Sequence, residues 1–311
     1  MRLVLGAIAI VLVIGLLGFF GAHWLFAEAP IQTATQVAQP IPGARASVDP
    51  EKEEAVVVSV EGKVEKVAVD GRWVEVAAGD RLVADDALRT DKTGRAELAI
   101  GEKSRLTVTE DTQLKVRELT RAVHQVQLTR GRLVASYDAD GERVLRIEDE
   151  KGSAVAETRA ARFSILSNGQ ALAVATETGT VNLEAAGKAV EVKAGQQAFA
   201  NVGQAPSAAT PIHADVLLKI ARALRADPSL CAVIEGTVDP GSQLDVDRTI
   251  IPVGANGRFR AEVARRPGRS AAEVTAQDPI GHLMKKTVQC SAQARAPPVK
   301  LQMNWEATDA G

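Results

Sequence analysis

Hydrophobic and polar residues alternate along most of the chain, and turn signals containing glycine interrupt the alternation at short intervals. Residues 163–196 show the pattern clearly, because an apolar residue occupies every second position of three successive runs. A period of two between turn residues is typical of half-buried antiparallel strands. We therefore predict three strands here, separated by turns at Asn168–Gly169, Thr178–Gly179 and Gly187.

The same pattern covers residues 55–205, which we predict to be one β domain. No proline occurs between residues 51 and 205, and proline is rare inside a paired sheet because it lacks the amide donor. Asp70–Gly71 and Asp140–Gly141 predict further hairpins, since both central positions of a type I′ turn need a positive φ. We expect an elongated antiparallel β-roll or β-sandwich.

Three short segments of this region resemble one another. Residues 60–67, 129–136 and 177–184 each place a glycine ahead of a run of alternating apolar residues. Weak self-similarity of this kind indicates that layers of the domain are built on one repeated plan.

The spacing of the hydrophobic residues changes from every second residue to a helical period in residues 206–229, which we predict to be a linker with a short amphipathic connector helix. Five apolar residues of this segment share one face of a helix, and Pro211 and Pro228 suit its first position and its end. These apolar residues are Val216, Leu217, Ile220, Ala221 and Leu224.

Alternation returns in residues 230–291, which we predict to be a small β-sandwich with a turn at Asp239–Pro240–Gly241 and a hairpin at Asn256–Gly257. Residues 292–311 form a mostly polar tail. Within it Val299, Leu301, Met303 and Trp305 alternate with polar residues. Residues 299–305 are therefore either an extra strand that docks on one of the domains or part of an irregular end.

The first 27 residues contain the most apolar stretch of the chain. Residues 3–26 form a run of 24 residues with His23 as its one polar member, whereas about 20 apolar residues suffice to span a bilayer as a helix. A secretory signal has an apolar region of only about 7–15 residues. We predict a retained transmembrane anchor at residues 1–27, with a signal cleaved after Ala29 as the alternative; Pro30 disfavours that cleavage.

The residues around the anchor predict its orientation. Arg2 precedes the apolar run and Glu28 follows it, which favours a cytoplasmic N-terminus. Residues 28–54 contain four prolines without a periodic apolar pattern and read as a disordered linker. We expect a single-pass inner-membrane protein whose C-terminal domains lie in the periplasm. In that oxidising compartment the two cysteines, Cys231 and Cys290, are predicted to form a disulfide.

Composition and charge exclude some functions. Hydrophobic residues make up 46% of the chain and charged residues 24%, as in ordinary globular proteins. The formal net charge is −2, and basic and acidic residues are interleaved. A nucleic-acid partner is not expected, because its recognition needs a basic surface.

Candidate chemistry is sparse. The four histidines lack the spacing of metal ligands, so we predict neither a metal site nor a cofactor, and no catalytic residue. Two clusters of aspartates come closest to a site: one resembles part of a calcium loop without the remaining ligand spacing, and the other contains no marked acid–base pair. We interpret the first as a polar hairpin turn. The histidines are His23, His124, His213 and His282. The first aspartate cluster consists of Asp138, Asp140 and Gly141, and the second consists of Asp239, Asp245 and Asp247.

The segments "VEGKVEKV", "RWVEVAAGD" and "ALRTDKTGRAEL" resemble the opening of the FecR domain, and "LTRGRLVAS" and "ETGTVNLE" resemble its central and closing strands. The resemblance covers residues 55–203. It departs at Ala160–Ala161, where the family usually has Gly-Thr. The matching residues are Gly62, Val64, Trp73, Gly79, Asp80, Arg89, Thr90, Gly94, Ala96, Leu98, Leu106, Leu114, Gly131, Leu133, Gly179, Val181, Gly195 and Gln196.

This resemblance implies a role in signalling. The family's type member is a membrane-bound transducer whose cytoplasmic segment acts on a sigma factor and whose periplasmic part senses a receptor. Only Met1 and Arg2 precede the apolar run here, so we expect the sigma-regulating role not to carry over.

Residues 232–290 are similar to bacterial immunoglobulin-like modules, which implies a spacer or adhesion element. The matching residues are Gly236, Pro240, Gly241, Gly257, Phe259, Gly268, Asp278 and Gly281.

The sequence thus predicts a non-enzymatic, membrane-anchored periplasmic protein that binds a protein or polymer partner in the cell envelope, with signal transduction as one role. Exposed strand edges are the expected contact sites. Two alternatives remain: an envelope enzyme or carbohydrate-processing accessory with a cleft between its domains, and a sensor whose signal crosses through residues 3–26.

Overall fold

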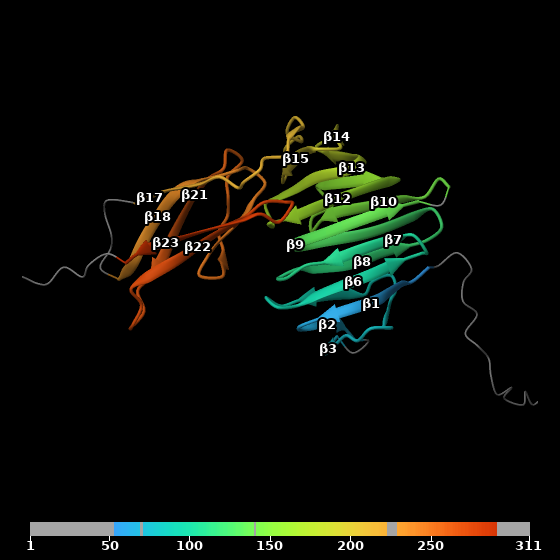
Figure 1. Cartoon of the computed structure of the whole chain (residues 1–311), viewed down its shortest axis with the longest axis horizontal. Helices are drawn as coiled ribbons and strands as arrows, with labels where there is room; N and C mark the ends of the chain where they lie inside the picture. The colour runs from blue at the N-terminus through green and yellow to red at the C-terminus, as the bar shows by residue number, and fades with distance from the viewer. Residues whose placement is uncertain (1–52, 69–70, 140, 223–228, 291–311) are drawn as a thin grey trace, which may run out of the picture. The chain divides into compact units, whose positions relative to one another are not determined.

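The computed structural model describes residues 53–68, 71–139, 141–222 and 229–290. In these residues the protein is mainly β, as predicted, and consists of strands and turns (Figure 1). Within the same ranges no helix is long and apolar enough to cross a membrane. The predicted anchor at residues 1–27, the linker up to residue 52 and the tail at 292–311 lie outside the described residues.

The first sixteen strands form one connected sheet, which folds over itself into two layers. We call this part the roll. Its strands are β1 Ala55–Glu61, β2 Val64–Val67, β3 Trp73–Glu75, β4 Arg81–Leu82, β5 Ala87–Thr90, β6 Arg95–Ile100, β7 Ser104–Val108, β8 Gln113–Leu119, β9 Val123–Asp138, β10 Val144–Asp149, β11 Ala154–Thr158, β12 Ala160–Ser167, β13 Ala171–Ala185, β14 Lys188–Lys193, β15 Gln196–Asn201 and β16 Thr210–Pro211.

Two long strands, β9 and β13, belong to both layers. The first half of β9 pairs with β8 and β10, and its second half pairs with β7 and β12. The first half of β13 pairs with β12 and β15, and its second half pairs with β11 and β14. A single hydrogen-bonded ladder therefore continues from one layer into the other.

Alternate residues of the strands fill the space between the layers. Leu133 and Ile165 point inward from one layer and Leu128 and Ile147 from the other, and none of the four is exposed to solvent. Burying a leucine or isoleucine side chain of this kind stabilises the fold by roughly 1.5–3 kcal/mol relative to leaving it exposed. The period-two pattern of the sequence is thus the pattern of the core.

The three similar segments of the sequence lie where the chain passes from one layer to the other. Gly62, Gly131 and Gly179 stand at these crossings, with φ of +61°, +90° and +77°. Each touches a neighbouring crossing so closely that a Cβ atom would lie 2.1–2.4 Å from the nearest atom of Thr93, Thr112 or Ala160. Only glycine permits this approach together with a positive φ. The predicted turn at Thr178–Gly179 is wrong, because β13 continues through it.

Buried threonines satisfy the backbone groups beside these crossings. The hydroxyl of Thr90 donates to the carbonyl of Thr109 at 2.6 Å and accepts the amide of Thr112 at 2.9 Å. The hydroxyl of Thr112 in turn accepts the amide of Arg132 at 3.0 Å. Because a buried backbone group without a partner is costly, these hydroxyls allow the ladder to be interrupted at the crossings.

At Ala160–Ala161 the sequence departs from the Gly-Thr of the FecR pattern, and the structure accommodates the change. Neither alanine has a positive φ, and the carbonyl of Ala160 is the group that Gly179 approaches. The glycine required at this crossing is therefore on the opposite strand.

The turn predictions are partly confirmed. Asn168–Gly169 connects β12 and β13 as a hairpin, and Gly187 lies in the hairpin between β13 and β14. Gly141 does not close a hairpin, because β10 pairs in parallel with the first half of β9. After β9 the chain therefore crosses to the other layer instead of folding back beside the same strand.

The remaining strands form two smaller sheets, ordered β17-β18-β21 and β20-β19-β22-β23. Cys231 in β18 and Cys290 directly after β23 are joined by a disulfide, which links the two sheets. Closing a loop of about 60 residues stabilises a fold by about 4 kcal/mol on the chain-entropy model. The strands are β17 Leu218–Arg222, β18 Leu230–Val238, β19 Gln243–Val246, β20 Thr249–Ile250, β21 Arg258–Ala264, β22 Ala271–Gln277 and β23 Leu283–Gln289.

Asn256–Gly257 forms a turn, but the strands on its two sides lie in different sheets, so the predicted hairpin is wrong. The predicted connector helix in residues 206–229 is also wrong in its described part. Residues 218–222 form β17, which pairs with β18. Val216 and Leu218 are buried while Leu217 is half exposed, a period of two. The spacing of the apolar residues is compatible with a helix and with a strand. The edge of β18 favours the strand, because it supplies hydrogen bonds to β17.

We predict that Gly131→Ala destabilises the roll by about 2–5 kcal/mol, the sum of a left-handed backbone cost of about 1–2 and overpacking of about 1–3. Gly169→Ala is the matched control, because Gly169 has a φ of +79° and no neighbouring atom within 4 Å of the added Cβ. It should cost about 1–2 kcal/mol. Urea denaturation measures both; equal losses would contradict the close approach at Gly131.

Candidate functional site

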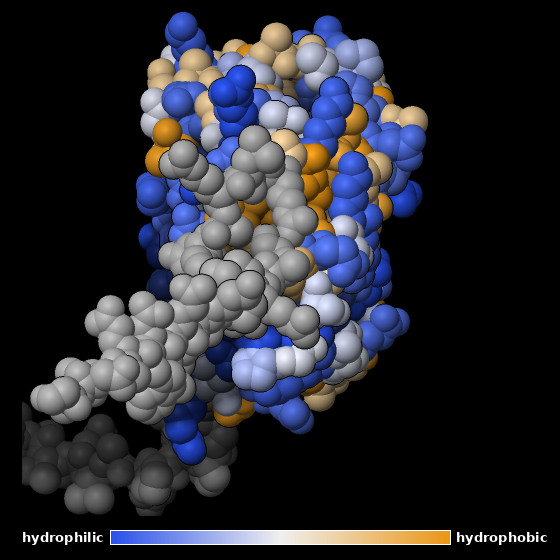
Figure 2. Space-filling view, turned by 90° about the vertical axis from the view of Figure 1, so that its left-hand side faces the viewer, coloured by the Kyte–Doolittle hydropathy of each residue, from blue (hydrophilic) through white to orange (hydrophobic). Residues whose placement is uncertain are grey.

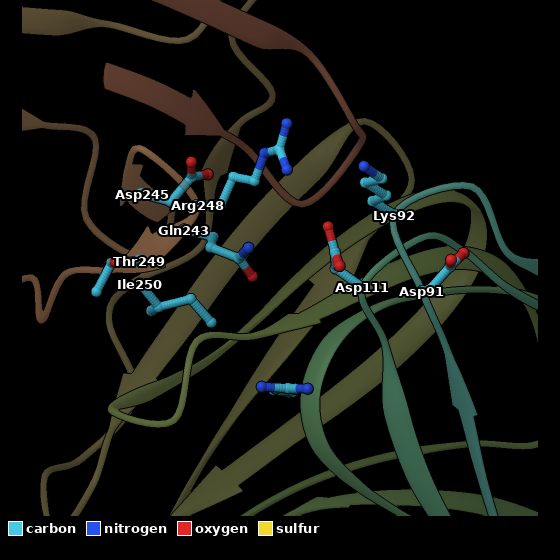
Figure 3. Close-up of a pocket in the computed structure, with 9 residues that line it drawn as sticks. Asp91, Lys92, Asp111, Gln243, Asp245, Arg248, Thr249 and Ile250 are labelled. Atoms are coloured by element: carbon cyan, nitrogen blue, oxygen red, sulfur yellow. The ribbon is translucent and has the colours of Figure 1, made fainter. Parts of the chain in front are cut away.

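A cleft of about 600 Å³ lies between the turns at the crossings of the roll and the hairpin formed by β19 and β20 (Figure 3). All described residues belong to one compact unit of the chain. The side chains that line the cleft are those of Asp91, Lys92, Asp111, Arg130, Gln243, Asp245, Arg248, Thr249 and Ile250.

The roll contributes polar residues because its crossings are made of turns and short strand ends. Lys92 and Asp111 lie in the turns after β5 and β7, and Arg130 directly precedes the crossing at Gly131. The carboxylate of Asp91 forms hydrogen bonds within its own turn, because it accepts both the amide and the hydroxyl of Thr93 at 2.8 Å. These hydrogen bonds lower the pKa of Asp91.

On the opposite side the β19–β20 hairpin has a two-residue turn, Asp247–Arg248, in which both residues have a positive φ, +50° and +70°. The carboxylate of Asp247 holds the turn by accepting the amide of Glu273 at 3.0 Å and pairing with Arg269 at 2.7 Å. Arg248 adopts the left-handed conformation that costs a residue with a side chain about 1–2 kcal/mol. The turn thus fixes Arg248 at the margin of the cleft (Figure 3).

Charges of both signs meet in the cleft. Burial raises the pKa of Asp245, and the negative charge of Asp111 raises it further. Gln243 has a buried side-chain oxygen without a hydrogen-bond partner among the described residues. The cleft can therefore hold a polar ligand that offers both hydrogen-bond donors and an anionic group. The lining residues include no histidine, cysteine or serine, and the titratable groups among them are carboxylates, a lysine and two arginines.

Beside the cleft a half-buried arginine joins the roll to the loop before β23. The guanidinium of Arg132 donates to the carbonyl of Ile280 at 3.1 Å. It lies so close to Gly281 that a Cβ there would be 2.9 Å from it. Burial lowers the pKa of Arg132. The side-chain amide of Asn168 donates to the carbonyl of Ser242 at 2.9 Å, a second contact of this kind.

One of the four histidines is buried in the roll. His124 is 1% exposed; its Nε2 lies 2.9 Å from the carboxylate of Glu53, and its Nδ1 lies 3.0 Å from the hydroxyl of Tyr137. Arg143 donates to the second oxygen of Glu53 at 2.8 Å. This cluster fastens residue 53 to the roll. No sequence signal marked it, because its four residues come from distant positions.

The other sequence candidates do not meet in a site. His213 is exposed, and His282 lies 3.0 Å from Asp278, its neighbour in the same loop. In the described ranges no group of three or more histidines, cysteines or carboxylates could hold a metal ion. His23 and Asp140 lie outside these ranges. Of the second aspartate cluster, Asp245 lines the cleft, Asp247 holds its hairpin, and Asp239 accepts the amide of Leu217.

Several residues of the FecR pattern serve the architecture of the roll. Gly62, Gly131 and Gly179 form its crossings, as described above. The guanidinium of Arg89 stacks over the ring of Trp73 at 4.2 Å and pairs with Glu65 at 2.7 Å, so three neighbouring strands are linked on the outer face.

In comparisons with known protein families, part of the chain matches one family. Residues 86–182 match the FecR protein family, a range that covers β5 to β12 and most of β13. Two crystal structures of a presumed anti-sigma factor from Parabacteroides distasonis align with the chain at 12% and 13% identity and a TM-score of 0.36. The alignments cover 41% of this chain and 60% of that protein. No curated protein matches the chain.

We predict that His124 makes the stability of the protein depend on pH. Burial lowers the pKa of His124 in the folded state, whereas the unfolded value is about 6.5. Below pH 6.5 the unfolded state therefore binds more protons, and the free energy of unfolding falls on acidification, by at most about 1.4 kcal/mol per pH unit.

The His124→Gln variant should show a shallower dependence between pH 7.5 and pH 5. His213→Gln is the matched control, since His213 is exposed. Urea titrations at several pH values measure both; an unchanged slope in His124→Gln would rule out this role.

Proposed function

Because residues 86–182 match the FecR protein family, we propose that this protein is a non-enzymatic regulator of signal transduction that is anchored in the inner membrane and binds a protein partner in the cell envelope. The match of residues 86–182 carries this proposal. That range includes both layers of the roll and two of the three crossings that contain a closely packed glycine, Gly131 and Gly179, so the family signal rests on the part that gives the domain its shape.

Residues 3–26 supply the anchor in this proposal, and the linker that ends at residue 54 holds the roll away from the bilayer. The roll and the β17–β23 part then lie in the periplasm. The disulfide between Cys231 and Cys290 supports this location, because such bridges persist in oxidising compartments. The predicted division into domains at residues 55–205 and 230–291, and the likeness of the second to immunoglobulin-like modules, remain part of the proposal.

The partner is proposed to bind by strand addition at β14. Within the described part of the roll β14 pairs with β13 alone, and its six residues form a longer free edge than β3, which has three. An unpaired edge offers backbone donors and acceptors to an incoming strand. The side chains of Lys188, Glu191 and Lys193 surround this edge with charge, which restricts the partners that can add to it.

We predict that a photo-reactive residue at position 191 captures a protein partner in intact cells, whereas the same residue at position 146, on the inner strand β10, does not.

Proline substitutions in β14 give a second test. Adjacent amides of a strand point to opposite edges. One of Ala189→Pro and Val190→Pro therefore removes only an outward donor. That variant, identified by its unchanged stability, should lose the partner and the transcriptional response of the cell. Capture unaffected by both variants would refute binding at β14.

The cleft supports a second candidate, a carbohydrate-processing accessory, because Asp111 and Asp245 face a space large enough for sugar residues. Such an activity would release sugar fragments from envelope polysaccharides and be lost in the double variant Asp111→Asn, Asp245→Asn. We expect that neither the unmodified protein nor the double variant releases sugar fragments, and that the transcriptional response is unchanged in the double variant. Chromatography of the incubated polysaccharide decides between the two candidates.

A further inference from the structure

The last described strand, β23, has an open edge. It pairs with β22, and no other described strand lies on its other side. Met284 and Val288 pack against the core between the two small sheets but are only partly buried. Figure 2 shows the side of the molecule on which β17 to β23 lie in Figure 1, and apolar residues gather there in an area bordered by hydrophilic ones.

The inner face of β23 is defined by its contacts. The ammonium group of Lys286 reaches across to the other sheet and donates to the carbonyl of Leu218 at 2.5 Å. Residues 284, 286 and 288 therefore point toward the core, while Leu283, which is 59% exposed, points away from it. The margin of the core along β23 is thus covered by two apolar side chains and one lysine.

A segment of the chain beyond the described residues has the pattern needed to cover this margin. Residues 299–305 are seven in number, as are those of β23, and alternate between apolar and polar side chains. The eight residues 291–298 can span up to about 26 Å, enough for the chain to turn back along β23. Pro297 and Pro298 precede the segment, where they remove no ladder donor from it.

We propose that residues 299–305 add to the free edge of β23 as an antiparallel strand, so that the four-stranded sheet gains a fifth. The apolar side chains face the core only in registers that differ from one another by an even number of residues, because a shift by one residue turns the polar set inward. The register that we propose places Val299 opposite Val288, Leu301 opposite Lys286 and Met303 opposite Met284.

This arrangement closes an edge that would otherwise template association with other chains. The proposal does not depend on the proposed function, because β14 lies in the roll and not in this sheet. Lys300, Gln302 and Asn304 would point to solvent on the outer face.

Hydrogen exchange of the β23 amides that do not bond to β22 tests the proposal in the full-length chain. These amides should exchange at least about tenfold more slowly than in the same chain ended after Ser291, since a ladder bond must open first. Leu301→Lys should abolish the protection, because it places a second positive charge opposite Lys286 on the inner face of the sheet. Gln302→Lys, the adjacent matched control, should keep it.

Equal exchange in the full-length and shortened chains would overturn the proposal. Loss of protection in both lysine variants would overturn the register. Protection that rises with protein concentration would mean that a second copy covers β23, and would also overturn the proposal. Partner capture at position 191 is expected to be unchanged in Leu301→Lys, so the two proposals fail independently.

Discussion

The close contact of backbone segments at the crossings between the two layers is the constraint on which the roll depends. At Gly62, Gly131 and Gly179 the chain turns from one layer into the other while touching a neighbouring crossing. A side chain at any of these positions would force the crossings apart. The long strands β9 and β13 could then no longer contribute one half to each layer, and the core between the layers would open.

The crossings also determine what the roll shows to its surroundings. Because turns are concentrated there, polar and charged residues such as Lys92, Asp111 and Arg130 gather on that side and form one wall of the cleft. The layers themselves end in short or charged strands, of which β14 is the most open.

The sequence predicted the strands well and the longer connections poorly. Asn168–Gly169 and Gly187 mark hairpins because a positive φ is needed locally, whatever the rest of the fold. Thr178–Gly179 carries the same local signal, yet β13 continues through it, because the positive φ serves a crossing between layers. The helix expected around Ile220 is a strand, since the edge of β18 supplies hydrogen bonds that a sequence pattern cannot show.

The sequence by itself determined the β class of the fold and the residues that fill its core, because alternation and turn chemistry act within a few residues of the chain. It also indicated the disulfide, because the chain has two cysteines and both follow the predicted anchor. Tertiary structure alone decided which strands pair, the burial of His124 against Glu53, and the cleft that unites Asp111 with Asp245. These features join residues far apart in the chain. Their energies depend on distance and burial, which arise only once the layers have closed on each other.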